Sequence, residues 1–194
     1  MACHPPLTAS PPAPPRARRG CSNLAGVSSP TTSDVVPIVV RRGVAADAAE
    51  FVRLRRLVFD AWPFQPDFEA DPGWAARCAQ AYRELIAGEN FAAFVADAPG
   101  RSGALAACVT IGIERHIPSP GGAGRTAYVA DMCTDAPFRG RGYGRMLLRA
   151  ATSWAEEQGA SGVHLYATEA GRGLYESEGF AEGGPFAHMT RWRR

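Results

Sequence analysis

Hydrophobic residues recur along the chain with two different spacings, and each spacing indicates one kind of secondary structure. Apolar residues two positions apart predict strands, and apolar residues three or four apart predict helices. We expect strands at residues 35–41, 91–96, 104–117, 126–134, 163–168 and 186–192. We expect helices from residue 47, at 72–87, after the turn at 139–144 as far as 158, and at 171–178. Hairpin connections first and helical crossovers later predict a mixed α/β sheet.

The ends of these helices carry signals of their own. Asp47 and Glu50 are spaced as in a capping box, and Pro72 stands in the first turn of the second helix. The helix that follows residue 142 has a continuous apolar face, made of Tyr143, Leu147, Ala150 and Trp154. These local patterns support the assignments made from periodicity.

Residues 1–34 contain seven prolines among Ser, Thr, Ala and Arg and show no hydrophobic periodicity. Such a composition does not build a packed core. Arginines without acidic residues before Asp34 are typical of transit peptides, but the prolines oppose the amphipathic helix that such a peptide needs. We expect a disordered extension or a start codon placed too early, followed by one domain at 35–194.

Composition narrows the chemistry. The chain has 194 residues, 46% of them hydrophobic, and a net charge of +2, so nothing in the balance favours nucleic acid or a membrane surface. All 21 basic residues are arginine, which excludes a Schiff-base lysine. The five cysteines include no CxxC pair and the four histidines show no metal-ligand spacing. We therefore expect no metal and a cytoplasmic location.

The segment RGRGYG at residues 139–144 is the strongest chemical signal. A helix N-terminus carries partial positive charge, so arginines around it are unfavourable unless an anion binds there. Glycines without a Cβ let the backbone approach such an anion closely. Neither GxxxxGK[ST] nor GxGxxG is present, which favours a diphosphate that is bound but not hydrolysed. A solvated turn is the alternative, and the strand, turn and helix context opposes it.

Three motifs in order now connect the chain to a known family. Residues 139–144 match R/Q-x-x-G-x-G/A, residues 129–138 match the strand and linker before it, and residues 173–180 match LYxxxGF. Over about residues 37–193 the chain resembles the GNAT superfamily of N-acetyltransferases. The resemblance implies a mostly antiparallel sheet of six to seven strands, with helices on both faces and a splay between the fourth and fifth strands.

The resemblance also implies acetyl-CoA as co-substrate. Its pantetheine arm would pair with the backbone of Met132, Cys133 and Thr134. Its diphosphate would rest on the amides of the glycine-rich turn, Arg139, Gly140, Arg141, Gly142, Tyr143, Gly144 and Arg145. A neutral amine would attack the thioester, and a backbone N–H of Met132 or Cys133 would stabilise the oxyanion. Tyr175 in LYxxxGF is the candidate acid for the departing sulfur.

The general base is where the sequence departs from a common family pattern. Family members often carry Glu on the strand before the pantetheine contacts, and Tyr128 and Ala130 stand there instead. Asp131 is adjacent, although strand alternation points it to the other face unless a bulge turns it. Glu114 on the neighbouring strand is a second candidate. A surface role for both carboxylates, or a water chain that ends on a carbonyl, stays open.

The acceptor is expected to be an amine of a small molecule or peptide. In the loop between the first two helices, aromatic and acidic residues interleave as a cationic amine would require: Trp62, Phe64, Asp67, Phe68, Glu69 and Asp71. The same pattern fits a loop whose aromatics cover the core. A non-catalytic acyl-CoA sensor and a transferase of longer acyl groups remain alternatives. We expect a monomer or homodimer, and no nucleic-acid partner.

Overall fold

The computed structural model describes residues 37–59 and 66–183, which belong to a compact unit that starts at Val36. In these residues five strands form one sheet: β1 (Val40–Arg42), β2 (Phe91–Asp97), β3 (Leu105–Arg115), β4 (Arg125–Thr134) and β5 (Val163–Leu165). The helices are α1 (Ala48–Phe59), α2 (Trp74–Ile86), α3 (Tyr143–Glu157) and α4 (Glu169–Ser177). The 3-10 turns η1 (Ala45–Asp47) and η2 (Ala136–Phe138) precede α1 and the glycine-rich turn.

The strands follow one another across the sheet in the order β1-β2-β3-β4-β5. The first four are antiparallel, and β5 is parallel to β4 because α3 crosses over between them. The predicted mixed, mostly antiparallel sheet is confirmed. The predicted six to seven strands are not matched, since the described residues hold five. The strand expected at 186–192 lies outside them.

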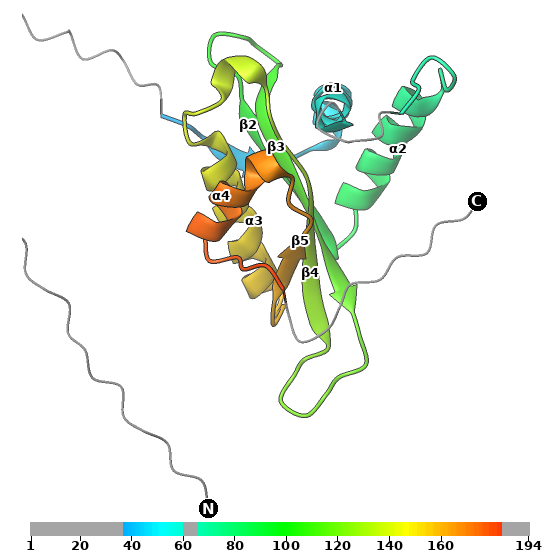
Figure 1. The fold of residues 1–194 in the computed structure, drawn as a ribbon. Coiled ribbons are helices and arrows are strands. Elements are labelled where there is room, and N and C mark those ends of the chain that lie inside the picture. Colours follow the sequence, from blue (N-terminus) through cyan, green and yellow to red (C-terminus); the bar gives the residue numbers. More distant parts are fainter. Residues whose placement is uncertain (1–36, 60–65, 184–194) are drawn as a thin grey trace, which may run out of the picture. The chain divides into compact units, whose positions relative to one another are not determined.

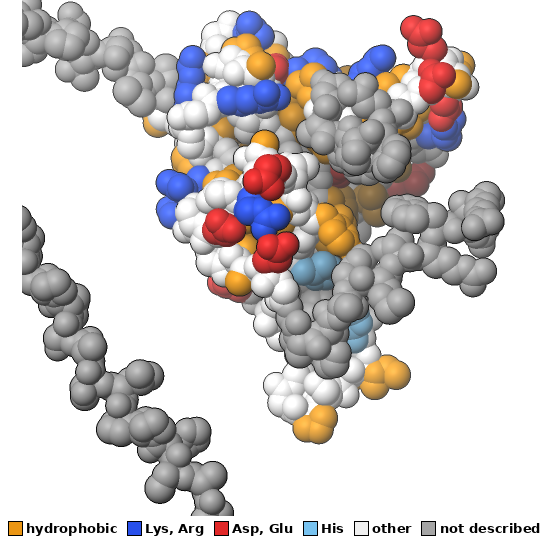
Figure 2. Space-filling model, viewed as in Figure 1, with side chains coloured by type: hydrophobic (Ala, Val, Ile, Leu, Met, Phe, Trp, Pro, Cys, Tyr) orange, Lys and Arg blue, Asp and Glu red, His pale blue; other side chains and the backbone are white. Residues whose placement is uncertain are grey.

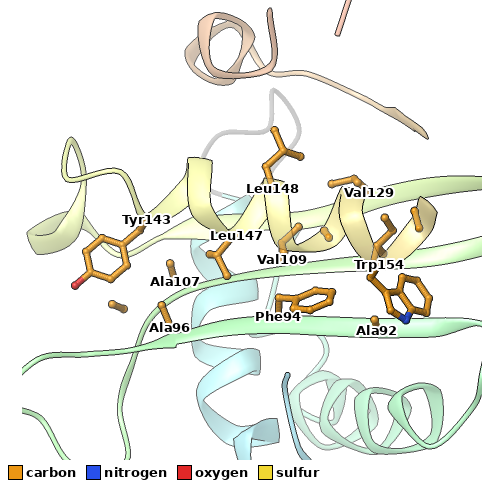
Figure 3. Packing of buried hydrophobic residues seen from close by; sticks show 14 of the residues in the cluster. Ala92, Phe94, Ala96, Ala107, Val109, Val129, Tyr143, Leu147, Leu148 and Trp154 are labelled. Carbon is orange, nitrogen blue, oxygen red and sulfur yellow. The ribbon is translucent and has the colours of Figure 1, made fainter. Parts of the chain in front are cut away.

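Helices cover both faces of the sheet, as predicted (Figure 1). On one face, α3 buries Leu147 and Trp154 against Phe94 of β2 and Val109 of β3 (Figure 3). Tyr143 is also buried, whereas Ala150 is only half-buried and Ala151 takes its place in the core. The predicted apolar face of α3 is therefore correct to within one position.

The opposite face of the sheet packs against α1 and α2. Phe51 and Leu54 of α1 and Tyr82 of α2 are buried with Val95 of β2. The rings of Phe51 and Tyr82 stack, with their centroids 4.5 Å apart. These contacts hold both helices on one side of the sheet.

The ends of the elements depart from expectation by a few residues. Asp47 and Glu50 do not form a capping box with each other: Asp47 Oδ2 accepts a hydrogen bond from the Val44 N–H at 2.8 Å, and Glu50 Oε2 accepts one from the Leu105 N–H at 2.9 Å. The fifth strand stops at Leu165 and not at residue 168. Thr168 instead caps α4 through a hydrogen bond from Gly171 N–H to its side chain at 3.3 Å.

Candidate active site

The glycine-rich turn leads directly into α3, which begins at Tyr143. Gly140 and Gly142 adopt φ values of 72° and 92°, a left-handed conformation that disfavours other residues. Gly142 is the N-cap and supplies no side-chain cap, so the first amides of α3 have no partner within the helix. A Cβ on Gly144 would lie 3.2 Å from Leu174 Cδ2, so glycine here also lets α3 approach α4. The turn therefore presents backbone donors at a helix N-terminus.

Two of the three arginines around this turn are bound by the chain itself. Arg139 Nε donates to the Thr134 carbonyl at 2.9 Å, and Arg145 Nε lies 3.0 Å from Glu178 Oε1. Arg141 is exposed, with its guanidinium 5.9 Å from the ring centre of Phe138. The sequence places arginines around the positively charged N-terminus of α3. Glu178 of the LYxxxGF segment compensates part of this positive charge.

Glu178 is a residue of the site that sequence reasoning missed. Its carboxylate also accepts two hydrogen bonds from Arg149, at 2.7 and 3.0 Å. These hydrogen bonds, together with the charges of Arg149 and Arg145, lower the pKa of Glu178 below its usual range. Glu178 thereby ties α3 to the end of α4. Its place within LYxxxGF was the available signal, but its partners depend on how the two helices pack.

The two strands β4 and β5 separate beside this turn. They pair only at Ala127–Val129, where Val129 is opposite Leu165, although β4 continues to Thr134. β5 itself ends at Leu165, so at the place of the predicted splay the rest of β4 has no pairing with β5. The next residues of β4, Ala130 to Met132, line a cavity of about 1580 Å³ that also reaches residues 165–169 after the splay.

A bulge turns Asp131 to the face that α1 covers. The register of β4 against β3 shifts between Cys108 and Thr110, and Asp131 has φ 52°. Its carboxylate accepts a hydrogen bond from Thr110 Oγ1 at 2.9 Å and pairs with Arg55 of α1. The sequence predicted that Asp131 would point to the other face unless a bulge turned it, and the structure has that bulge. The carboxylate of Asp131 lines the cavity, but its charge is already compensated.

Tyr175 lies in α4 and is buried, with 9% of its surface exposed, at the wall of the same cavity. Burial raises the pKa of its hydroxyl above 10. A Cβ on Gly171 would come within 2.9 Å of the Tyr175 ring, so a glycine one turn earlier leaves space for it. The LYxxxGF segment thus places Tyr175 in the lining of the cavity that also contains the β4 bulge.

Glu114 does not line the cavity. Its Oε2 accepts a hydrogen bond from Thr126 Oγ1 at 3.3 Å and lies 3.4 Å from His164 Nε2 of β5. The ring of His164 packs 5.3 Å from that of Tyr128, which does line the cavity. Glu114 is therefore connected to the cavity through an aromatic contact rather than facing it. His164 was missed because only strand pairing brings it beside Glu114.

The acidic loop after α1 does not form the cavity wall in the part that the structure describes. Asp71 pairs with Arg77, and Asp67 Oδ1 accepts hydrogen bonds from backbone N–H groups two and three residues later, at 3.0 and 3.1 Å. Phe68 packs against Phe59 and Trp74. This agrees with the alternative that the aromatics cover the core. Trp62 and Phe64 lie outside the described residues.

Within the described ranges, no helix has the length and apolar character needed to cross a bilayer. The same ranges contain no group of three or more His, Cys, Asp or Glu arranged to hold a metal ion.

Comparison with known proteins supports the resemblance to the GNAT family that the sequence motifs indicated. A family model described as "Acetyltransferase (GNAT) family" matches residues 51–180. A search of curated proteins finds no match. A predicted acetyltransferase with acetyl-CoA from Clostridium acetobutylicum is 19% identical, with a TM-score of 0.65, and the match covers 79% of this chain and 96% of that one.

Two further solved structures share the fold. Glucosamine-6-phosphate N-acetyltransferase from Arabidopsis thaliana is 16% identical, with a TM-score of 0.62 and coverage of 80% of this chain and 98% of that one. An aminoglycoside acetyltransferase from an uncultured soil sample, in complex with sisomicin, is 18% identical, with a TM-score of 0.57 and coverage of 81% and 97%. The fold and the match to the family model agree with the three sequence motifs: the chain belongs to the acetyltransferase (GNAT) family, whose acetyl donor is acetyl-CoA.

Proposed function

We propose that this protein transfers an acetyl group from acetyl-CoA to the primary amine of a small molecule or peptide, by direct attack of the amine on the thioester. One observation carries the proposal: a single cavity is bordered by the β4 bulge, by the residues after the β4–β5 splay and by Tyr175. A thioester placed there would lie within reach of the backbone of β4 and of Tyr175.

The donor would enter along the splay. Backbone groups of Met132, Cys133 and Thr134 are our candidates for pairing with the pantetheine amides, because β4 has no strand pairing with β5 beyond Val129. The diphosphate would accept hydrogen bonds from the amides between Arg139 and Arg145. A helix N-terminus with glycines in left-handed conformations is a suitable anion site.

In the chemical step, the amine nitrogen bonds to the carbonyl carbon and the carbonyl oxygen becomes an oxyanion. The backbone N–H of Met132 or Cys133 would stabilise it. Collapse breaks the carbon–sulfur bond and releases the thiolate. We assign Tyr175 a hydrogen bond to this sulfur, since the raised pKa of its buried hydroxyl makes complete proton transfer more costly than from an ordinary tyrosine.

The proton that the amine loses on attack needs a separate acceptor. Asp131 is engaged by Arg55 and Thr110, which favours a role in holding the bulge over a role as a free base. Glu114 lies outside the cavity, and its Oε2 is 3.4 Å from His164 Nε2. We propose that water carries the proton from the amine toward this pair.

Two matched glycine substitutions test donor binding at the turn. Gly140 and Gly159 have φ values of 72° and 75°, and at both positions a Cβ would meet no atom within 4 Å. Gly140→Ala is expected to weaken acetyl-CoA binding about tenfold, because the strained turn misdirects its amides. Gly159→Ala carries the same strain at the far end of α3 and should leave the affinity unchanged. Isothermal titration calorimetry compares the two.

Equal affinities in both variants would remove the turn from the donor site. Thiol release from acetyl-CoA in the presence of amines then separates catalysis from sensing, since a sensor binds the donor without releasing thiol. Competition with propionyl-CoA and succinyl-CoA tests whether a longer acyl group is the true donor.

A further inference from the structure

Helix α2 has an apolar side that is only partly used by the core. Tyr82 and Ile86 pack in the core between α1 and the sheet, and Tyr82 also borders the cavity. Trp74, Ala81 and Leu85, seven and four residues apart, line the cavity as well. Leu85 has half of its surface exposed. An apolar stripe that the fold leaves beside a cavity can bind an apolar ligand.

Other parts of the cavity lining are aromatic. Phe91 at the start of β2, Tyr128 of β4 and Tyr166 after β5 all border it. The rings of Tyr128 and Tyr166 meet edge to face, with centroids 5.9 Å apart, and Tyr166 has 62% of its surface exposed. Figure 2 shows hydrophobic surface beside the charged side chains of α4, on the side of β5. The cavity that the α2 stripe borders therefore also has aromatic rings in its lining.

The charges around the cavity do not suit a polycation. The carboxylates of its described lining are Asp131, which pairs with Arg55, and Glu169, whose side chain is 92% exposed and lies 3.6 Å from Arg172. Arg55 and Arg77 also line the cavity, but each is paired with a carboxylate, Arg55 with Asp131 and Arg77 with Asp71. The described lining therefore offers a second ammonium group on the acceptor one carboxylate at most, that of Glu169.

We infer that the acceptor is a primary monoamine attached to an aromatic or similarly bulky apolar body, such as an arylalkylamine. The inference rests on the proposed acetyl transfer and adds the class of acceptor. The amine nitrogen reaches the thioester near the β4 bulge, while the apolar body lies against the α2 stripe and the aromatic rings of the lining. We expect polyamines and aminoglycosides to be poorer acceptors, because the described lining offers their further ammonium groups only the exposed carboxylate of Glu169.

The test compares kcat/KM for thiol release at saturating acetyl-CoA. 2-Phenylethylamine and tryptamine are expected to exceed ethylamine by about 100-fold, because burying an apolar body improves discrimination by this order. Spermidine and kanamycin should be no better than ethylamine. A polycation that equals or exceeds 2-phenylethylamine would overturn the inference and leave acetyl transfer standing.

A pair of variants locates the effect. Ala81→Phe fills the cavity from α2 and should raise KM for 2-phenylethylamine at least tenfold with little change in KM for acetyl-CoA. Ala76→Phe adds the same bulk at an exposed position of α2 outside the cavity lining and should change neither. If Ala81→Phe leaves the amine KM unchanged, the body does not lie against α2 and the inference is wrong.

A binding measurement separates this inference from the proposed function. Calorimetry of 2-phenylethylamine and spermidine with the enzyme–CoA complex reports on the cavity even when no acetyl group moves. Preferential binding of 2-phenylethylamine without thiol release would refute the proposed catalysis, while showing that the cavity itself selects an aromatic monoamine. Absence of that preference would refute the inference, whatever the outcome for catalysis.

Discussion

At the scale of single residues, Tyr82 is an unusual member of the core. Its side chain is 2% exposed and its hydroxyl has no hydrogen-bond partner among the described residues. The hydroxyl lies close to Gly43, where a Cβ would come within 2.3 Å of it. Burial, with a further contribution from Asp47, raises its pKa. The residue thus combines a favourable ring stack on Phe51 with an unsatisfied polar atom.

Removing that hydroxyl should not harm the fold. We expect Tyr82→Phe to keep or increase the free energy of unfolding by up to about 1 kcal/mol, because a buried donor without a partner is lost and the ring stays. Urea denaturation measures the change. Tyr82→Ala, which also deletes the ring, should lose about 3–5 kcal/mol. A loss above 1 kcal/mol in Tyr82→Phe would mean that the hydroxyl has a partner.

Tyr175 differs from Tyr82 because its hydroxyl belongs to the proposed site. Tyr175→Phe is expected to lower kcat about 10²-fold, the small end of the range for a lost acid, with the Kd for acetyl-CoA unchanged. Because its pKa is raised above 10, ionisation of Tyr175 should not reduce activity below that pH. Steady-state kinetics across pH checks both points. An unaltered kcat would show that Tyr175 plays no part in the reaction.

At the scale of elements, α1 is anchored through carboxylates near its start. Asp47 accepts hydrogen bonds from Arg41 and the Val44 N–H. Glu50 accepts them from Arg53 and the Leu105 N–H. Burial raises the pKa of both carboxylates, but these hydrogen bonds outweigh it, so each pKa lies below its ordinary value.

These lowered pKa values predict a loss of stability in acid. The contribution of Asp47 and Glu50 is complete above about pH 5 and is lost as the pH falls through their folded-state pKa values, which lie below 3.8 and 4.5. We expect a loss of about 2–4 kcal/mol from the two together. Urea denaturation at pH 6 and pH 3 measures it. The double variant Asp47→Asn, Glu50→Gln should lose less between these pH values, and an equal loss would contradict the assignment.

Elements were predictable where one periodicity dominates. Helix α2 was expected at 72–87 and is found at Trp74–Ile86, because its apolar spacing and flanking Pro72 and Gly88 agree. The capping box failed because Glu50 finds a backbone partner 55 residues away. Helix-end rules consider neighbours in sequence, whereas this hydrogen bond exists only after α1 packs on β3.

At the scale of the whole molecule, the predictable part of the site is the part that is contiguous in sequence. Residues 139–144 can be recognised from the sequence by the spacing of their glycines and by their charge. The partners of Asp131 come from two other elements, Arg55 on α1 and Thr110 on β3, and no local pattern contains them. The contribution of α2 to the cavity was not predicted for the same reason, since its lining residues are brought beside β4 only by packing.

The separation of β4 from β5 after Val129 leaves a strand whose neighbour, in the proposed complex, is a metabolite. Thermodynamic linkage then adds a binding contribution to the free energy of unfolding. This contribution grows by about 1.4 kcal/mol for each tenfold rise in free donor above its Kd. The lifetime of the folded enzyme would thus follow the supply of acetyl-CoA, with the protein most persistent in cells when the acetyl groups it transfers are abundant.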